Sequence, residues 1–223
     1  MRTKSLTGLS WFAFFAAFFL AGCGGPEEST GGGDGSSNGS DAAGSGESVE
    51  VAGGEALVWG EGDRGVVLAH GAAYDAASWR EQAERLAGSG VATLAVEDTS
   101  TQSVAEAAGY LKEERGVRDV TLIGASAGTA GVLGAAEDPG LADGVILLSG
   151  TGDVSGLGVY PKLFVASEGE GLAGEVRSMA EEAPGSRNEA LILPGDAHAQ
   201  AIFETDQGER LLRTILERLE DNG

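Results

Sequence analysis

Hydrophobic residues from about residue 49 onward fall into short runs that alternate with amphipathic stretches. Seven apolar, often β-branched runs predict strands at residues 56–59, 66–69, 91–96, 120–123, 145–148, 163–166 and 190–193. Stretches with helical spacing of apolar residues predict helices at residues 76–87, 103–114, 127–137, 173–183 and 207–219. This alternation is typical of a mostly parallel sheet between two layers of helices. We therefore predict an α/β fold, a three-layer α/β/α domain with about seven strands.

The chain begins with a different pattern, in which Arg2 and Lys4 precede an apolar run at residues 11–21. This run is too short to span a bilayer comfortably and predicts a signal peptide over residues 1–22. It ends in Leu-Ala-Gly-Cys at residues 20–23, which resembles a bacterial lipobox. The resemblance implies cleavage before Cys23 and attachment of lipid to its thiol. Cys23 is the only cysteine in the sequence, so no internal disulfide can form.

Residues 24–48 are small or polar and offer almost nothing large to bury. Such a composition predicts a disordered tether. We therefore divide the chain into a signal peptide (1–22), a lipidated cysteine with its tether (23–48) and one folded domain (49–223). The lipobox resemblance implies that the mature protein carries more than one acyl chain, which is enough to anchor it stably to a membrane. We therefore expect it outside the cytoplasm, attached to a bacterial membrane.

The formal net charge of −21 limits the partners of this chain. It argues against nucleic acids as partners, because their binding depends on Lys and Arg side chains that neutralise phosphates. The acidity is most simply explained by a solvated, soluble surface.

Candidate chemistry centres on residues 120–128, Val-Thr-Leu-Ile-Gly-Ala-Ser-Ala-Gly, where a predicted strand runs directly into Ser126. A nucleophilic serine needs a tight turn from strand to helix, and Gly124 and Gly128 leave room for the neighbouring backbone there. Ser37 also lies in a Gly-x-Ser-x-Gly pattern, but no strand precedes it. This context makes Ser126 the predicted nucleophile.

The run His-Gly-Ala-Ala-Tyr-Asp at residues 70–75 directly follows the second predicted strand. A loop of small residues can point a backbone N–H at a substrate carbonyl oxygen, and we assign this role to Ala72. The N–H of Ala127, next to the nucleophile, supplies the second oxyanion donor. His70 either organises this loop or merely ends the strand, and is not interpreted as the catalytic base.

The general base is predicted to be His198, the only histidine after Ser126, in the loop before the last predicted helix. A catalytic triad also needs an acid that orients the imidazole. Three carboxylates are candidates: Glu170 and Glu168 in the turn after the sixth predicted strand, and Asp153 after the fifth. Any of them could equally be a solvated turn residue.

The order of these motifs, over residues 56–219, resembles the α/β-hydrolase family. Asp75 and Trp79 after the His-Gly loop, with Gly-Ala-Ser-Ala-Gly at the nucleophile, look like its small esterase and dienelactone-hydrolase-like members. The resemblance implies an eight-stranded sheet with one antiparallel edge strand. It also favours Glu170 as the acid, three residues past Ser167, where related enzymes usually place theirs.

Two features depart from that family. The loop at residues 97–100 reads Glu-Asp-Thr-Ser and lacks the Arg-Gly-His-Gly run that is common there. The acid, if it is Glu170, is glutamate where aspartate is more common.

The segment between residues 148 and 163 is too short for the helical lid that many family members insert, so we predict no substantial cap domain. An open cleft favours small or protruding carboxylic esters, with Tyr74, Trp79 and Phe203 as candidate apolar lining. The predicted function is ester hydrolysis by Ser126, His198 and Glu170, without metal or organic cofactor. The alternatives are an amidase or thioesterase with the same triad, and a non-catalytic surface-bound binding protein.

Overall fold

The computed structural model of the chain describes residues 46–51 and 53–221. The predicted signal peptide, the lipidation site Cys23 and almost all of the tether lie outside the described residues. None of the described helices is long and apolar enough to cross a membrane.

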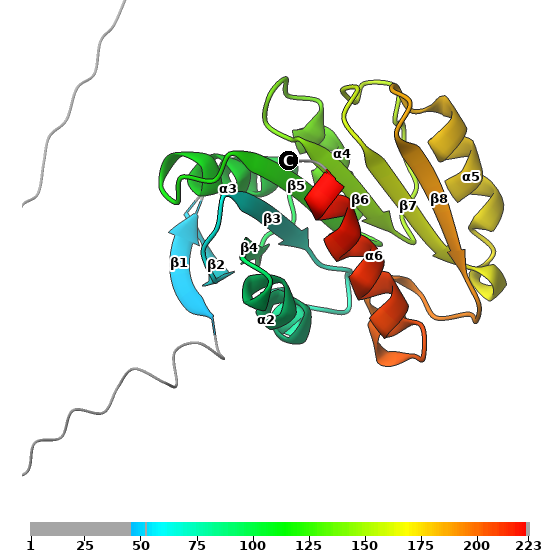
Figure 1. Cartoon of the computed structure of the whole chain (residues 1–223), viewed down its shortest axis with the longest axis horizontal. Helices are drawn as coiled ribbons and strands as arrows, with labels where there is room; N and C mark the ends of the chain where they lie inside the picture. Colours follow the sequence, from blue (N-terminus) through cyan, green and yellow to red (C-terminus); the bar gives the residue numbers. More distant parts are fainter. Residues whose placement is uncertain (1–45, 52, 222–223) are drawn as a thin grey trace, which may run out of the picture. The chain divides into compact units, whose positions relative to one another are not determined.

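The described residues form one sheet with the strand order β1-β2-β4-β3-β5-β6-β7-β8 (Figure 1). β2 pairs antiparallel with β1 and β4, and every other neighbouring pair is parallel. The strands are β1 (Glu47–Val51), β2 (Gly54–Trp59), β3 (Arg64–Ala69), β4 (Val91–Val96), β5 (Asp119–Ala125), β6 (Gly144–Leu148), β7 (Lys162–Ser167) and β8 (Asn188–Leu193). The predicted α/β class and mostly parallel sheet are thus confirmed.

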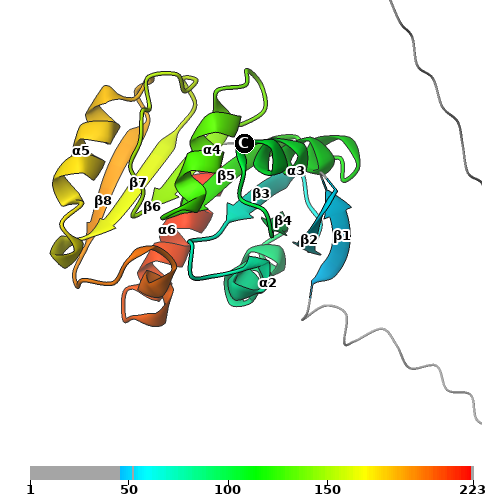
Figure 2. The ribbon, with the colours of Figure 1, turned by 180° about the vertical axis from the view of Figure 1, so that it is seen from behind.

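Helices cover both faces of the sheet. The α-helices are α2 (Arg80–Gly88), α3 (Thr101–Glu113), α4 (Gly128–Ala136), α5 (Ala173–Glu182) and α6 (Gly208–Asp221), and the short 3-10 helices are η1 (Ala76–Trp79), η2 (Glu168–Glu170) and η3 (Ala199–Glu204). α2 and α6 lie in front of the sheet in Figure 1, and α3, α4 and α5 lie on the opposite face in Figure 2.

The two faces form separate hydrophobic clusters, because alternate residues of each strand point to opposite sides. Leu68 joins the cluster with α2 and α6, whereas its neighbour Val67 joins the cluster with α3, α4 and α5. β4, β6 and β7 are buried along their whole length, as expected of central parallel strands.

We predicted about seven strands, and seven of the eight strands of the sheet correspond to the predicted ones. The missed strand, β1, has the sequence Glu-Ser-Val-Glu-Val and begins two residues before the predicted domain boundary at Val49. Its first two residues are exposed, and it lies at the edge of the sheet against β2 alone. A strand with so little to bury leaves only a weak hydrophobic pattern. The helix predicted at residues 76–87 is divided into η1 and α2.

No helix or strand lies between β6 and β7, so the described domain has no cap at this position, as predicted. The carboxyl ends of β5, β6 and β7 are therefore not covered by an insertion there.

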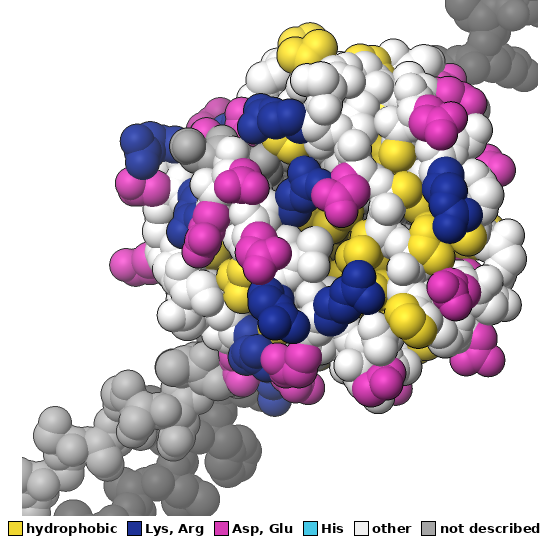
Figure 3. Space-filling view, turned by 45° about the vertical axis from the view of Figure 1, so that its right-hand side comes forward, with side chains coloured by type: hydrophobic (Ala, Val, Ile, Leu, Met, Phe, Trp, Pro, Cys, Tyr) yellow, Lys and Arg dark blue, Asp and Glu magenta, His cyan; other side chains and the backbone are white. Residues whose placement is uncertain are grey.

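The face over α5, β8 and α6 carries arginines interspersed with carboxylates (Figure 3). Arg218 of α6 forms an ion pair with Glu189 of β8, and Arg85 binds Glu209 at 2.8 Å. These two arginines are thus paired with carboxylates, and the face shows both signs of charge side by side.

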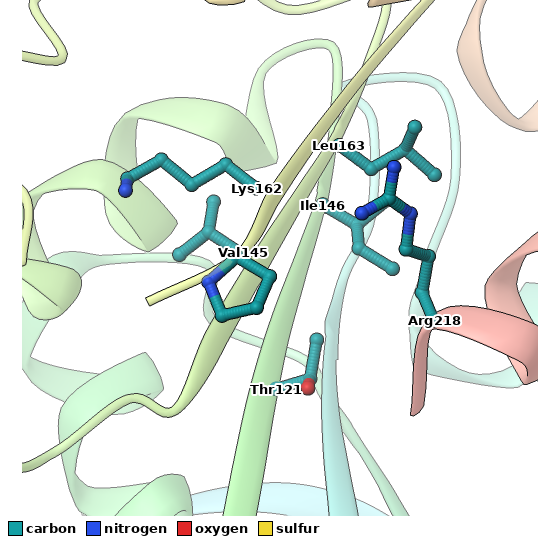
Figure 4. A pocket seen from close by; sticks show the side chains of 7 residues that line it. Thr121, Val145, Ile146, Lys162, Leu163 and Arg218 are labelled. Carbon is teal, nitrogen blue, oxygen red and sulfur yellow. The ribbon is translucent and has the colours of Figure 1, made fainter. Parts of the chain in front are cut away.

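Lys162, the first residue of β7, is 1% exposed. Its Nζ donates hydrogen bonds to the carbonyl oxygens of Gly158 (2.7 Å), Tyr160 (2.8 Å) and Pro184 (2.7 Å). Burial lowers the pKa of Lys162 to about 8, so the ammonium group is charged at neutral pH. Its side chain points away from Arg218, beside a cavity of about 10 Å³ that could hold no more than one water molecule (Figure 4).

We expect Lys162→Met to lower the free energy of unfolding by about 2–3 kcal/mol, because three carbonyl oxygens lose a charged donor. Urea denaturation followed by circular dichroism would measure this change. Arg177→Met, which alters an exposed side chain of α5, is the control and should change the stability by less than about 0.5 kcal/mol. Equal midpoints for wild type and Lys162→Met would contradict the structural role of this lysine.

Candidate active site

Ser126 occupies a tight turn between β5 and α4. Its backbone has φ of +47°, a left-handed conformation that is uncommon outside glycine. Its N–H donates to the carbonyl of Leu148 (2.9 Å), and its carbonyl accepts from the N–H of Thr129 (3.1 Å). These bonds hold the strained turn at the carboxyl ends of β5 and β6.

Gly124 and Gly128 lie where other side chains would collide with backbone. A Cβ atom on Gly128 would lie 2.5 Å from the carbonyl oxygen of Ala69, and one on Gly124 would lie 2.9 Å from Cα of Thr129. The predicted reason for these two glycines is therefore correct.

His198, in the loop between β8 and η3, lies beside Ser126. Its Nε2 is 2.9 Å from Oγ of Ser126, and its Nδ1 is 2.7 Å from Oε2 of Glu170. The imidazole side chain is 52% exposed, so substrate can reach it from solvent. The three side chains form one continuous hydrogen-bonded chain.

Glu170, at the end of η2, presents its carboxylate from a nearly buried position, with the side chain 5% exposed. Oε1 accepts hydrogen bonds from the N–H of Ser167 (2.5 Å) and the hydroxyl of Ser149 (2.8 Å). This reciprocal cap of η2 fixes the carboxylate and leaves Oε2 for His198.

The other two candidate acids lie elsewhere. Glu168 is exposed in η2 and has no hydrogen bond to His198. Asp153 is exposed and accepts from the N–H of Ser155 (2.9 Å), and hydrogen bonds from the side chain and backbone of Ser155 lower its pKa. Of the three carboxylates, only Glu170 contacts the imidazole.

The His-Gly loop after β3 lies against Ser126, since a Cβ atom on Gly71 would lie 3.5 Å from Cβ of Ser126. The N–H of Gly71 is already bound to Oε1 of Gln200 (2.8 Å). Within residues 46–51 and 53–221, the N–H groups of Ala72 and Ala127 have no hydrogen-bond acceptor. Both groups are therefore available to a ligand oxygen.

His70 holds this loop and does not contact Ser126. Its ring nitrogens lie 2.9 Å from the carbonyl oxygen of Gly71 and 3.0 Å from that of Glu97. Of the two interpretations of His70, the loop-organising one fits these contacts.

Sequence reasoning missed Gln200, which is 5% exposed and anchors the same loop. Besides accepting from Gly71, its amide donates to the hydroxyl of Ser78 (2.9 Å), which in turn donates to the carbonyl of Asp75 (2.5 Å). Gln200 could have been recognised in the sequence as a large polar residue inside an apolar segment, two positions after His198.

A cavity of about 150 Å³ adjoins this loop. It is lined by Tyr74, Ser78, Glu81, Gln82, Gln200, Phe203 and Glu204. Tyr74 and Phe203, two of the three candidate apolar lining residues, line this cavity. Trp79 does not, because it is 1% exposed and packs edge-on against Phe203, with ring centroids 6.0 Å apart.

The described residues contain no group of three or more His, Cys, Asp or Glu side chains arranged to hold a metal ion.

No protein-family model and no curated protein sequence matches the chain. Solved structures do match. One is described as a predicted CIB-like hydrolase from Thermoplasma acidophilum, with 19% identity and a TM-score of 0.61, covering 79% of this chain and 97% of that one. A thermophilic esterase from Thermogutta terrifontis has 16% identity and a TM-score of 0.64, covering 79% and 99%. A hormone-sensitive lipase from a metagenome library has 15% identity and a TM-score of 0.65, covering 79% and 85%. The chain therefore has the α/β-hydrolase fold, as predicted.

Proposed function

We propose that this protein is a serine hydrolase of small carboxylic esters, held at the outside of the cytoplasmic membrane or in the cell envelope by lipid on Cys23. The observation that carries the proposal is the hydrogen-bonded chain from Ser126 through His198 to Glu170, with steps of 2.9 and 2.7 Å. These distances lie within the range required for proton transfer between a nucleophile, its base and an orienting acid.

In the proposed reaction, Oγ of Ser126 attacks the ester carbonyl carbon while Nε2 of His198 removes its proton. The N–H groups of Ala72 and Ala127 bind the oxyanion of the tetrahedral intermediate. The intermediate collapses to an acyl-serine as His198 gives the proton to the departing alcohol. Water, deprotonated by the same histidine, then attacks the acyl-serine, and His198 returns the proton to Oγ of Ser126 as the carboxylic acid is released.

Glu170 supports both proton transfers without taking the proton itself. Its carboxylate accepts from Nδ1–H of His198, which leaves Nε2 unprotonated and facing Ser126. Its negative charge also stabilises the imidazolium that forms after each proton transfer.

Small esters are the substrates that the site favours. The adjoining cavity holds about 150 Å³, which is smaller than typical sites for drug-sized ligands. No lid is inserted between β6 and β7 to cover a long acyl chain. Esterases and a lipase are among the solved proteins with this fold, which supports ester hydrolysis over amide or thioester cleavage.

Lipid anchoring is proposed from the sequence alone. The Leu-Ala-Gly-Cys run at residues 20–23 and the charged start of the chain favour it.

A fluorophosphonate probe, which reacts with activated serines, tests the proposal on the full-length protein in detergent. We expect covalent labelling of the wild type, none of Ser126→Ala, and labelling of His198→Ala that is at least about 100-fold slower. Hydrolysis of p-nitrophenyl acetate, butyrate and palmitate would then be compared.

Absence of labelling in folded wild-type protein would contradict the proposal and leave a non-catalytic binding protein. Much faster cleavage of palmitate than of acetate or butyrate would contradict the preference for small substrates.

A further inference from the structure

We infer that Ser149 is a positioning residue that couples the triad acid to the loop of the triad base. The inference rests on the proposed function. Ser149 follows β6 and is 3% exposed. Its Oγ lies 2.8 Å from Oε1 of Glu170 and 2.8 Å from the backbone nitrogen of Ala199, the residue after His198. One hydroxyl group therefore contacts both the carboxylate of the acid and the backbone next to the base.

The direction of these two hydrogen bonds is fixed by chemistry. The N–H of Ala199 can only donate, so the hydroxyl oxygen of Ser149 accepts there. The single hydroxyl proton is then available for Oε1 of Glu170, and an ionised carboxylate can only accept. The arrangement is complete when Glu170 is charged, which is the state that orients His198 and stabilises its imidazolium.

The backbone around Ser149 is held in the same rigid frame. Its own N–H donates to the carbonyl of Val165 in β7 (2.8 Å), while the preceding carbonyl, that of Leu148, accepts from Ser126 (2.9 Å). The end of β6 thus connects the nucleophile turn with the strand that leads to Glu170.

Backbone conformation marks the same set of residues. Among the described residues, the non-glycine positions with positive φ are Ser126 (+47°), Ser149 (+50°) and Ala199 (+52°). Such conformations cost free energy and persist where surrounding contacts hold them. All three belong to the hydrogen-bonded network around His198. The strained backbone conformations therefore occur in the residues that Ser149 connects.

Removing the hydroxyl would affect both ends of the link. Glu170 would keep only the N–H of Ser167 on Oε1, and the buried N–H of Ala199 would lose its acceptor. The base would then be held less firmly at both its acid and its backbone, while the cavity beside the His-Gly loop, which Ser149 does not line, would keep its lining.

The test compares Ser149→Gly and Ser149→Ala in the full-length protein, with p-nitrophenyl acetate as the substrate. Both variants lack the hydroxyl, but glycine adopts positive φ freely and therefore removes any cost of the turn itself. We expect kcat to fall about 10- to 100-fold in both variants, as for loss of a hydrogen bond to a charged group, with KM changed less than about threefold. Ser155→Ala, which alters an exposed serine outside the network, is the control with unchanged kcat.

Hydrogen exchange at the amide of Ala199, followed by NMR, gives a readout that needs no activity. We expect its protection to fall at least about tenfold in Ser149→Gly. Wild-type kcat in Ser149→Gly, or wild-type protection of Ala199, would overturn the role of Ser149. A wild-type protein that cleaves no ester, with Ala199 protection still dependent on Ser149, would instead contradict the proposed function.

Discussion

Replacing Glu170 by glutamine is expected to lower kcat for p-nitrophenyl acetate about 10⁴-fold, the effect that loss of the triad acid has in serine hydrolases. The amide fills the same space but carries no charge to stabilise imidazolium. Its NH₂ group can also donate to Nδ1 of His198, which favours the tautomer with a proton on Nε2, facing Ser126. Stopped-flow or steady-state kinetics at saturating substrate would measure the loss.

Two matched variants locate the acid. Glu168→Gln and Asp153→Asn make the same neutral substitution at exposed carboxylates that do not contact the imidazole, so kcat should stay within about twofold of wild type. A 10⁴-fold loss in either of them, with Glu170→Gln active, would assign the acid elsewhere.

The elements that sequence reasoning located best are those buried on both faces. β4 and β6 were predicted within one residue of their observed bounds, because a short, mostly apolar run is typical of a central strand in a parallel sheet. β1 was missed because an edge strand buries little, and its Val-Glu-Val ending follows directly on a Gly/Ser-rich segment. β8 lies at the other edge but ends in the apolar run Ala-Leu-Ile-Leu, so it was predicted; an edge strand is missed when, as in β1, it lacks such a run.

The candidate site shows a similar division. Ser126 can be selected from one sequence because its Gly-x-Ser-x-Gly pattern follows a predicted strand, and His198 because it is the only histidine after Ser126. Glu170 and Glu168 are two positions apart in one turn, and only the turn of η2 decides which carboxylate faces the imidazole. The resemblance to a known family, not the local sequence, favoured the one that the structure places there.

Ser149 and Gln200 could not be predicted by pattern at all. Their hydrogen bonds join residues 50 and 129 positions apart in the chain, to Ala199 and Gly71. A buried polar side chain needs such partners, but the sequence does not say which loop supplies them. The hydrogen bonds of Ser149 and Gln200 depend on how the loops at the carboxyl edge of the sheet pack against one another.

Gly128→Ala tests whether the close packing of the nucleophile turn against the His-Gly loop positions Ser126. A Cβ atom at this position would lie 2.5 Å from the carbonyl oxygen of Ala69 and 2.7 Å from that of His70. Both are backbone atoms at the end of β3, so no flexible side chain can move aside. We expect the free energy of unfolding to fall by about 3 kcal/mol, and kcat to fall about 100-fold or more because Ser126 shifts relative to the oxyanion donors.

Gly109→Ala is the matched control, since Gly109 lies inside α3 and a Cβ atom there would contact nothing within 4 Å. Alanine should stabilise this helix by about 0.5–1 kcal/mol and leave kcat unchanged. The two variants make the same chemical change on helices of the same face. Changes of opposite sign in the free energy of unfolding, measured by urea denaturation, would therefore identify the contact of position 128 with the backbone at the end of β3 as the cause. If Gly128→Ala instead matched Gly109→Ala in both stability and kcat, α4 would have room to move away from β3. The tight turn would then not be what positions Ser126.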